Sequence, residues 1–67
     1  MRLNVNYLQE IMEQNNWSIR QFAMKTGLSP ATLSRILNKK RGAGVKAIGA
    51  IRKALPKESM DRLFFLD

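Results

Sequence analysis

The stretch that decides the fold runs from Ser18 to Leu37 and reads SIRQFAMKTGLSPATLSRIL. It opens with a capping box. The Ser18 side chain is placed to accept a hydrogen bond from the Gln21 backbone amide, and the Gln21 side chain can reach back to the Ser18 backbone amide. A helix is therefore predicted to begin at Ser18. Gly27 follows the apolar residues of this helix and suits the left-handed conformation in which helices commonly end.

A second helix is predicted to start directly after this turn and to run to about Leu37. Ser29 is its expected N-cap, and Pro30 takes the first helical position, where a missing N–H costs nothing. Apolar pairs flank both caps in the positions of a hydrophobic staple, namely Trp17 with Phe22 and Leu28 with Leu33. Two short helices joined by so tight a turn are expected to cross steeply as a helix-turn-helix.

Apolar residues recur at helical spacing on both sides of this stretch. Before it, a helix is expected between the N-cap Asn4 and the Asn15-Asn16 pair. After it, residues 38–44 are predicted to form an exposed loop, and a fourth helix stops before Pro56. The fourth apolar stripe is Val45, Ala47, Ile48, Ile51 and Leu55, and a fifth helix carries Met60, Leu63 and Phe64. With no strand expected, the prediction is an all-α fold, a compact five-helix bundle in a single domain over residues 1–67.

The charge of the chain is strongly one-sided. Its 67 residues hold 12 Lys and Arg against 5 Asp and Glu, and no carboxylate lies between Gln14 and Lys57. Such a surface concentrates polyanions and gains from counterion release when it neutralises phosphates. Two other interpretations stay open: a solvated basic face that only keeps the protein soluble, and an anionic membrane surface, which needs a longer amphipathic basic helix.

Composition argues against several classes of function. With no His and no Cys, the chain lacks a thiol nucleophile, an imidazole base and the usual zinc ligands. We therefore expect neither an enzyme nor a cofactor or metal site. The lack of Cys suits a reducing cytoplasm, and no apolar run reaches the roughly 20 residues of a membrane span. A cytoplasmic protein is expected, associated with the nucleoid when bound to DNA.

The stretch from Ser18 to Ile36 resembles the helix-turn-helix of phage Cro and lambda-type repressor proteins. The matching residues are Ser18, Phe22, Ala23, Gly27, Leu28, Ser29, Thr32, Leu33, Ser34, Arg35 and Ile36. The flanking helices fit the five-helix plan of that family, so the resemblance spans nearly the whole chain. It implies a DNA-binding transcriptional regulator whose third helix, about residues 30–37, enters the major groove.

The chain departs from the family pattern at three places. Ile19 and Pro30 stand where many members carry a Gln, and Leu37-Asn38-Lys39 replaces a common Glu-Asn-Gly. These changes leave the fold assignment intact. The details of base readout, however, have to be argued from this sequence.

The exposed side of the third helix carries the candidate base readers. If that helix enters the major groove, its first turn and its next exposed turn face base edges, which selects Pro30, Ala31, Thr32, Ser34 and Arg35. Arg35 is the strongest discriminator among them, because a guanidinium can fork to guanine O6 and N7. Two alternatives stay open: Arg35 grips a phosphate, and the Thr32 hydroxyl only supports its own helix start.

A second set of residues is expected to contact phosphates. It combines the start of the second helix, the loop after the third and the first turn of the fourth: Ser18, Arg20, Asn38, Lys39, Lys40, Arg41 and Lys46. A solvated charge run is the alternative for the loop.

Three further features have an ordinary structural interpretation. Trp17 is expected in the core rather than stacked on a base. Gly42-Ala43-Gly44 is expected to be a flexible loop rather than a phosphate cradle. Glu58 and Asp61 are expected to form a surface ion pair with Arg62 rather than a catalytic pair.

The end of the chain bears on the oligomeric state. Phe65 would lie about 100° around a helix from the apolar face of the fifth helix, and an exposed aromatic on so small a protein indicates a partner surface. Phe65 and Leu66 are therefore the candidate interface residues of a two-fold homodimer, as in relatives that pair through their last helix. The alternative is that Phe65 folds back over the first or fourth helix.

The sequence thus predicts a sequence-specific regulator that binds double-stranded DNA. We expect a repressor of phage, prophage or mobile-element type that binds a short operator as a homodimer. Two alternatives on the same fold stay open: an antitoxin-type regulator, and a protein-interaction adaptor that has lost DNA contact. A toxin or an anti-repressor is a possible protein partner.

Overall fold

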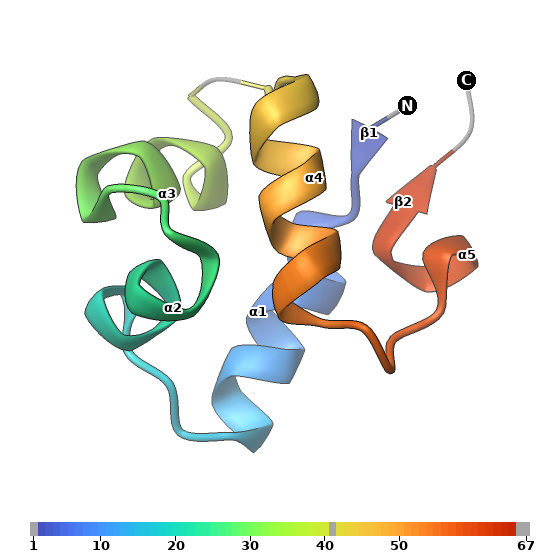
Figure 1. The fold of residues 1–67 in the computed structure, drawn as a ribbon, viewed down its shortest axis with the longest axis horizontal. Helices are drawn as coiled ribbons and strands as arrows, with labels where there is room; N and C mark the ends of the chain where they lie inside the picture. Colours follow the sequence, from blue (N-terminus) through green and yellow to red (C-terminus); the bar gives the residue numbers. More distant parts are fainter. Residues whose placement is uncertain (1, 41, 66–67) are drawn as a thin grey trace.

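The computed structural model describes residues 2–40 and 42–65. Within them, five helices and one small sheet follow in the order β1 (Arg2–Leu3), α1 (Val5–Gln14), α2 (Ile19–Thr26), α3 (Pro30–Leu37), α4 (Val45–Ala54), α5 (Met60–Leu63) and β2 (Phe64–Phe65). Figure 1 shows α4 in the middle, with α2 and α3 on one side of it and α5 with the two strands on the other. The predicted all-α fold is confirmed, apart from the two short strands.

The predicted helix boundaries around the turn are confirmed. The Ser18 hydroxyl accepts from the Gln21 amide at 3.1 Å, and the Gln21 side-chain oxygen accepts from the Ser18 amide at 3.0 Å, which completes the capping box. Gly27 ends α2 with φ of +79°. The next helix begins at once, because Ser29 caps it and Pro30 fills its first position. The turn therefore sets α2 and α3 against each other as a helix-turn-helix.

The core lies where the five helices meet. Its largest fully buried side chains come from every helix: Leu8, Phe22, Leu33, Ile36, Ile51 and Leu63. Burying each of them contributes roughly 1.5–3 kcal/mol of hydrophobic free energy. The Trp17 ring stacks on Phe22 with centroids 5.9 Å apart, so the expected core position of Trp17 is confirmed. This core holds α3 by its inner face only.

The end of the chain differs from the expectation of a helix without strands. The fifth helix ends at Leu63, and Phe64 and Phe65 form β2, which pairs antiparallel with β1. The physical reason is that a strand turns successive side chains to opposite faces. Phe64 is thereby buried at 3% exposure while Phe65 is 45% exposed. The Asn4 amide donates to the Leu63 carbonyl at 2.7 Å, which joins the start of α1 to the end of α5.

One residue of the predicted α4 stripe was placed wrongly. Val45 is 89% exposed, whereas Ala47 and Ile51 are buried. Residues two positions apart lie about 200° apart around a helix, so Val45 and Ala47 cannot face the same core. Val45 opens α4 on its outer side.

No helix among the described residues is long and apolar enough to cross a membrane.

Candidate nucleic-acid interface

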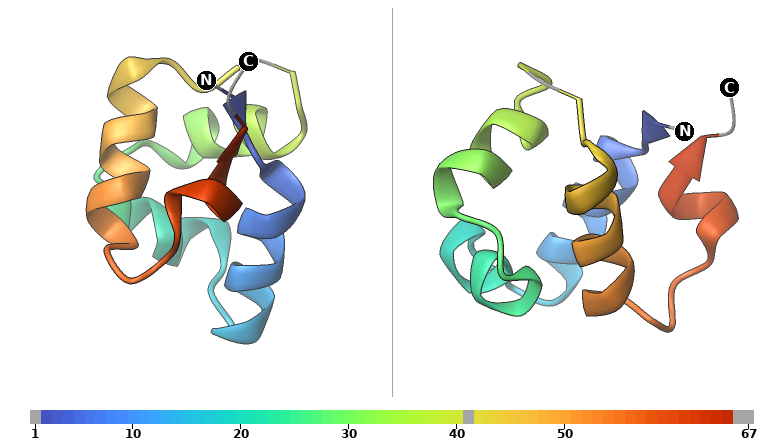
Figure 2. Two further views of the ribbon diagram at one scale, coloured as in Figure 1. Left: turned by 90° about the vertical axis from the view of Figure 1, so that its right-hand side faces the viewer. Right: turned by 45° about the horizontal axis from the view of Figure 1, so that its top comes forward.

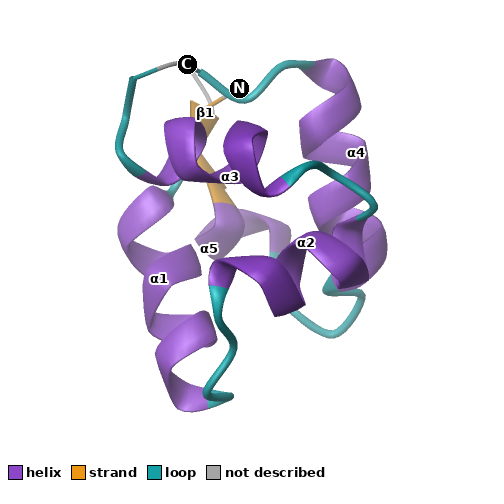
Figure 3. Cartoon of the chain, turned by 90° about the vertical axis from the view of Figure 1, so that its left-hand side faces the viewer, coloured by secondary structure: helices purple, strands orange, loops and turns teal. Residues whose placement is uncertain are grey.

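The third helix is anchored on one face and bare on the other. Leu33, Ile36 and Leu37 are buried, and they fix α3 on the scaffold as the sequence predicted. The five predicted base readers lie on the remaining surface: Pro30, Ala31 and Arg35 are exposed, and Thr32 and Ser34 are half-buried. Figure 3 shows this side of the molecule, with α3 above α2 and nothing in front of either helix.

Two of these side chains are held by hydrogen bonds within the helix. The Ser29 hydroxyl donates to the Thr32 hydroxyl at 2.8 Å, and it accepts from the Thr32 amide at 3.1 Å. Thr32 thus supports its own helix start, as one alternative proposed, while its hydroxyl proton stays available to an acceptor. The Ser34 hydroxyl accepts from the Asn38 side-chain amide at 3.3 Å. Both hydroxyls are therefore oriented by neighbours before any ligand arrives.

The loop after α3 is fixed by backbone hydrogen bonds. The Lys39 amide donates to the Ile36 carbonyl at 3.1 Å, and the Lys40 amide donates to the Arg35 carbonyl at 2.9 Å. Lys39 adopts a left-handed conformation with φ of +60°. Both lysine side chains are exposed, so the loop presents two cations at the end of α3.

The remaining predicted phosphate contacts within the described residues come from the start of α2 and from the first turn of α4. Arg20 on α2 and Lys46 on α4 are exposed. The Ser18 hydroxyl is used as an acceptor in the capping box, which leaves its proton to donate. Arg41, which the sequence also predicted to contact phosphate, lies outside the described residues, as does Leu66 of the predicted dimer contact.

Two residues near this surface have roles that the sequence analysis did not assign. The Lys25 ammonium lies 4.7 Å from the centroid of the Trp17 ring, which is a cation–π geometry. Ile19, at the position where many relatives carry Gln, packs against the core. The spacing of aromatic and basic residues could have indicated the first contact, whereas the packing of Ile19 depends on the tertiary fold.

The expected surface ion pair of Glu58 and Asp61 with Arg62 does not form within residues 2–40 and 42–65. Glu58 lies in the turn before α5, and its carboxylate accepts from the Tyr7 hydroxyl of α1 at 2.5 Å. That hydrogen bond raises the pKa of Tyr7 above its ordinary value of 10.0, and a hydrogen bond with Arg62 acts in the opposite direction. The helical spacing failed here because residue 58 is not in a helix.

Comparison with known proteins agrees with this geometry. A helix-turn-helix family model matches residues 8–63. A Bacillus subtilis (strain 168) protein, described as the uncharacterized HTH-type transcriptional regulator YvzC, is 41% identical over 49 residues, which are 73% of this chain. The aligned part covers 64% of the length of that relative. No solved structure matches the chain.

Proposed function

The chain belongs to the lambda-repressor-like helix-turn-helix family, and on that premise we propose that it is a transcriptional regulator that binds double-stranded DNA sequence-specifically through α3. The family assignment agrees with the expectation of a non-enzymatic domain. The observation that carries the proposal is the exposed face of α3, which has no carboxylate and presents Arg35 beside two hydroxyl groups, while Leu33, Ile36 and Leu37 on the other face are buried.

Base readout is proposed for the first two turns of α3. An α-helix fits the major groove, and its N-terminal residues reach the base edges. Pro30, Ala31 and the Thr32 methyl group offer apolar surface to thymine methyls. Ser34 and Thr32 offer hydroxyls, and the Arg35 guanidinium offers the fork that matches guanine O6 and N7.

Phosphate contacts are proposed for four exposed cations on α2, on α4 and in the loop after α3. Lys39 and Lys40 follow α3, Arg20 lies on α2 and Lys46 on α4, and all four are exposed. Such contacts position a protein on the duplex without carrying sequence information themselves. Since no acid occurs between Gln14 and Lys57, no carboxylate on these elements repels the DNA backbone.

The proposed biological unit is a homodimer that represses transcription from a short two-fold operator of phage, prophage or mobile-element type. Phe65 supports the dimer, because its ring is 45% exposed at the end of a two-residue strand. The Arg2 guanidinium covers part of that ring at 5.5 Å from its centroid. The repressor type rests on the resemblance to phage repressors.

Selection of bound duplexes from a random pool tests the proposal. Enrichment of one short motif is expected, and a pool that stays random after repeated rounds would reject sequence-specific binding. In the enriched duplex, replacing guanine by 7-deazaguanine removes the N7 acceptor from the major groove and is expected to weaken binding by about tenfold or more. Replacing guanine by inosine at positions outside the deazaguanine sites alters the minor groove and is expected to have little effect.

A further inference from the structure

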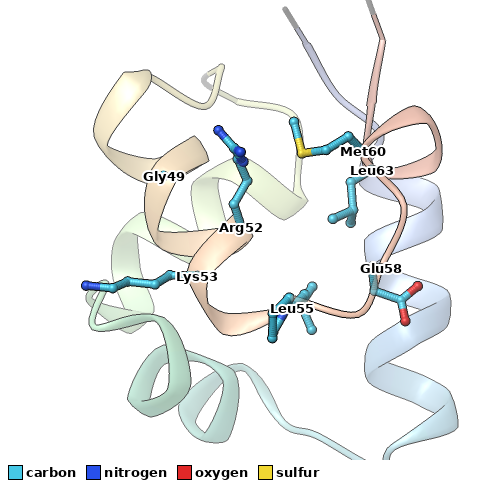
Figure 4. A pocket seen from close by; sticks show the side chains of 8 residues that line it. Gly49, Arg52, Lys53, Leu55, Glu58, Met60 and Leu63 are labelled. Carbon is cyan, nitrogen blue, oxygen red and sulfur yellow. The ribbon is translucent and has the colours of Figure 1, made fainter.

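A cleft of about 390 Å³ opens on the side of α4 that faces α5 (Figure 4). Its apolar lining comes from the end of α4 and from the α5 segment: Leu55, Pro56, Met60 and Leu63. Leu55 and Leu63 belong to the core, so the floor of the cleft is the outer edge of that core. The apolar lining that stays open to water is that of Pro56, which is exposed, and Met60, which is half-buried. A partner's apolar side chain can be buried there.

Gly49 leaves one wall of the cleft without a side chain. A Cβ added at this position would meet no atom within 4 Å, and no positive φ requires glycine there. Glycine inside a helix is less favourable than alanine, because it loses more backbone freedom on folding. Neither packing nor backbone geometry explains this cost, whereas an occupant of the cleft would need the space.

The rim of the cleft is mainly cationic. Arg52 extends from α4 beside the cleft, and Figure 4 shows its guanidinium on the same side as Met60. No ion pair with Arg52 is found among residues 2–40 and 42–65. Glu58 also lines the cleft, but its carboxylate accepts from the Tyr7 hydroxyl. Lys53 is a second cation in the lining, and the exposed Lys57 lies next to the lining residues in the chain.

The cleft lies away from the face that is proposed to read DNA. The left view of Figure 2 shows α5 between α1 and α4, and Figure 3 shows α3 and α2 on the opposite side of the molecule. A nucleic-acid backbone would use the cations but would leave the apolar floor without a matching group. An acidic protein segment with apolar residues on one face satisfies both features of the cleft.

We propose that this cleft binds an acidic amphipathic helix of a partner protein. An apolar side chain of that helix packs on Pro56 and Met60, and one of its carboxylates pairs with Arg52. This is the mode in which an amphipathic helix lies in an apolar groove. Because the cleft and α3 lie on opposite sides, the partner and the DNA can be bound together.

The test uses the full chain, labelled with ¹⁵N, and a synthetic peptide of Glu and Leu placed at helical spacing. A second peptide with Lys in place of every Glu is the control. We expect the acidic peptide to shift the amide signals of α4 and α5 and to leave those of α3 unchanged. The basic peptide is expected to shift neither.

Two variants locate the binding in the cleft. Gly49→Leu fills the open wall with a good helix former, and Arg52→Glu reverses the rim charge. Each is expected to weaken binding of the acidic peptide by about tenfold or more, because Gly49→Leu occupies the space of the peptide's apolar side chain and Arg52→Glu repels its carboxylates. Arg20→Glu is the matched control, because it reverses an exposed arginine on α2 and is expected to leave peptide binding unchanged. Thermal unfolding of each variant verifies that it folds.

Four outcomes would overturn the proposal. Signals that shift equally at all lysines and arginines would indicate non-specific attraction of a polyanion. Unchanged affinity in Gly49→Leu would place the peptide elsewhere. Cleft signals that shift with protein concentration alone would make a second copy the occupant, and cleft signals that respond to duplex DNA would make it a nucleic-acid surface. None of these results bears on whether α3 binds DNA.

Discussion

The Lys39 backbone amide donates to the Ile36 carbonyl at 3.1 Å and so satisfies a carbonyl at the C-terminal end of α3. Lys39 does this in a left-handed conformation, with φ of +60°. A left-handed conformation costs a residue with a Cβ roughly 1–2 kcal/mol, and glycine adopts it freely. The sequence resemblance places Lys39 where related proteins commonly carry glycine. This chain therefore has a cation at a strained position directly beside the proposed DNA-reading helix.

Lys39→Gly is expected to stabilise the fold and to weaken DNA binding. The free energy of unfolding should rise by about 1 kcal/mol, because glycine relieves the strain. Denaturant unfolding followed by the fluorescence of Trp17, the single Trp of the chain, measures it. Affinity should fall similarly on all sequences, with the salt dependence reduced by about one phosphate contact. Lys40→Gly is the control: it removes the same charge, and a comparable gain in stability there would contradict the role of backbone strain.

Gly27→Ala and Gly49→Ala are expected to change stability in opposite directions. At both positions an added Cβ would meet no atom within 4 Å, so packing is not affected. Gly27 has φ of +79°, and alanine there should cost roughly 1–2 kcal/mol. Gly49 is in the middle of α4, where alanine should stabilise by about 0.5–1 kcal/mol. Thermal unfolding of the two variants side by side measures both signs, and a shared sign would mean that the turn is not held by backbone conformation.

The features that could be predicted from the sequence are the local ones. Ser18 with Gln21, Gly27, and Ser29 with Pro30 set the ends of α2 and α3 through interactions within a few residues, and the burial of Leu33 on α3 follows from helical spacing. The exposed positions of the proposed base readers follow from the same spacing.

The features that could not be predicted depend on residues far apart in the chain. Phe65 becomes a strand residue because it pairs with Arg2, and Glu58 meets Tyr7 across 51 positions. The conformation of Lys39 is a further example, since nothing in its side chain favours a positive φ.

The stability of the fold is expected to decline at alkaline pH through Tyr7. The pKa of Tyr7 is raised above 10.0, chiefly by its hydrogen bond to Glu58. The protonated hydroxyl is thus favoured in the folded state, and its contribution is complete below pH 10 and is lost as the pH rises through the raised pKa. Because Tyr7 is the single Tyr, tyrosinate absorbance reports it alone. In Tyr7→Phe, the decrease in the free energy of unfolding that follows from Tyr7 ionisation should disappear. A Tyr7 pKa at or below its ordinary value would contradict the hydrogen bond to Glu58.

Phe65→Lys is expected to give a folded monomer. The Phe65 side chain points out of the core, so the change spares the packing and places like charges together near a two-fold axis. Sedimentation should show a dimer for the unmodified chain and a monomer for the variant, with affinity for a two-fold site lowered. Met24→Lys, at another exposed apolar residue, should remain dimeric. An unmodified chain that sediments as a monomer, both free and on DNA, would refute the dimer.

Base reading by Arg35 on α3 is decided by comparing the DNA affinities of Arg35→Ala and Lys40→Ala on two duplexes. One duplex carries the selected motif and the other an unrelated sequence. Arg35→Ala is expected to lose about 1–3 kcal/mol of binding free energy on the selected duplex and much less on the unrelated one, while Lys40→Ala loses the same on both. An equal loss for Arg35→Ala on the two duplexes would refute base reading and make Arg35 a phosphate contact.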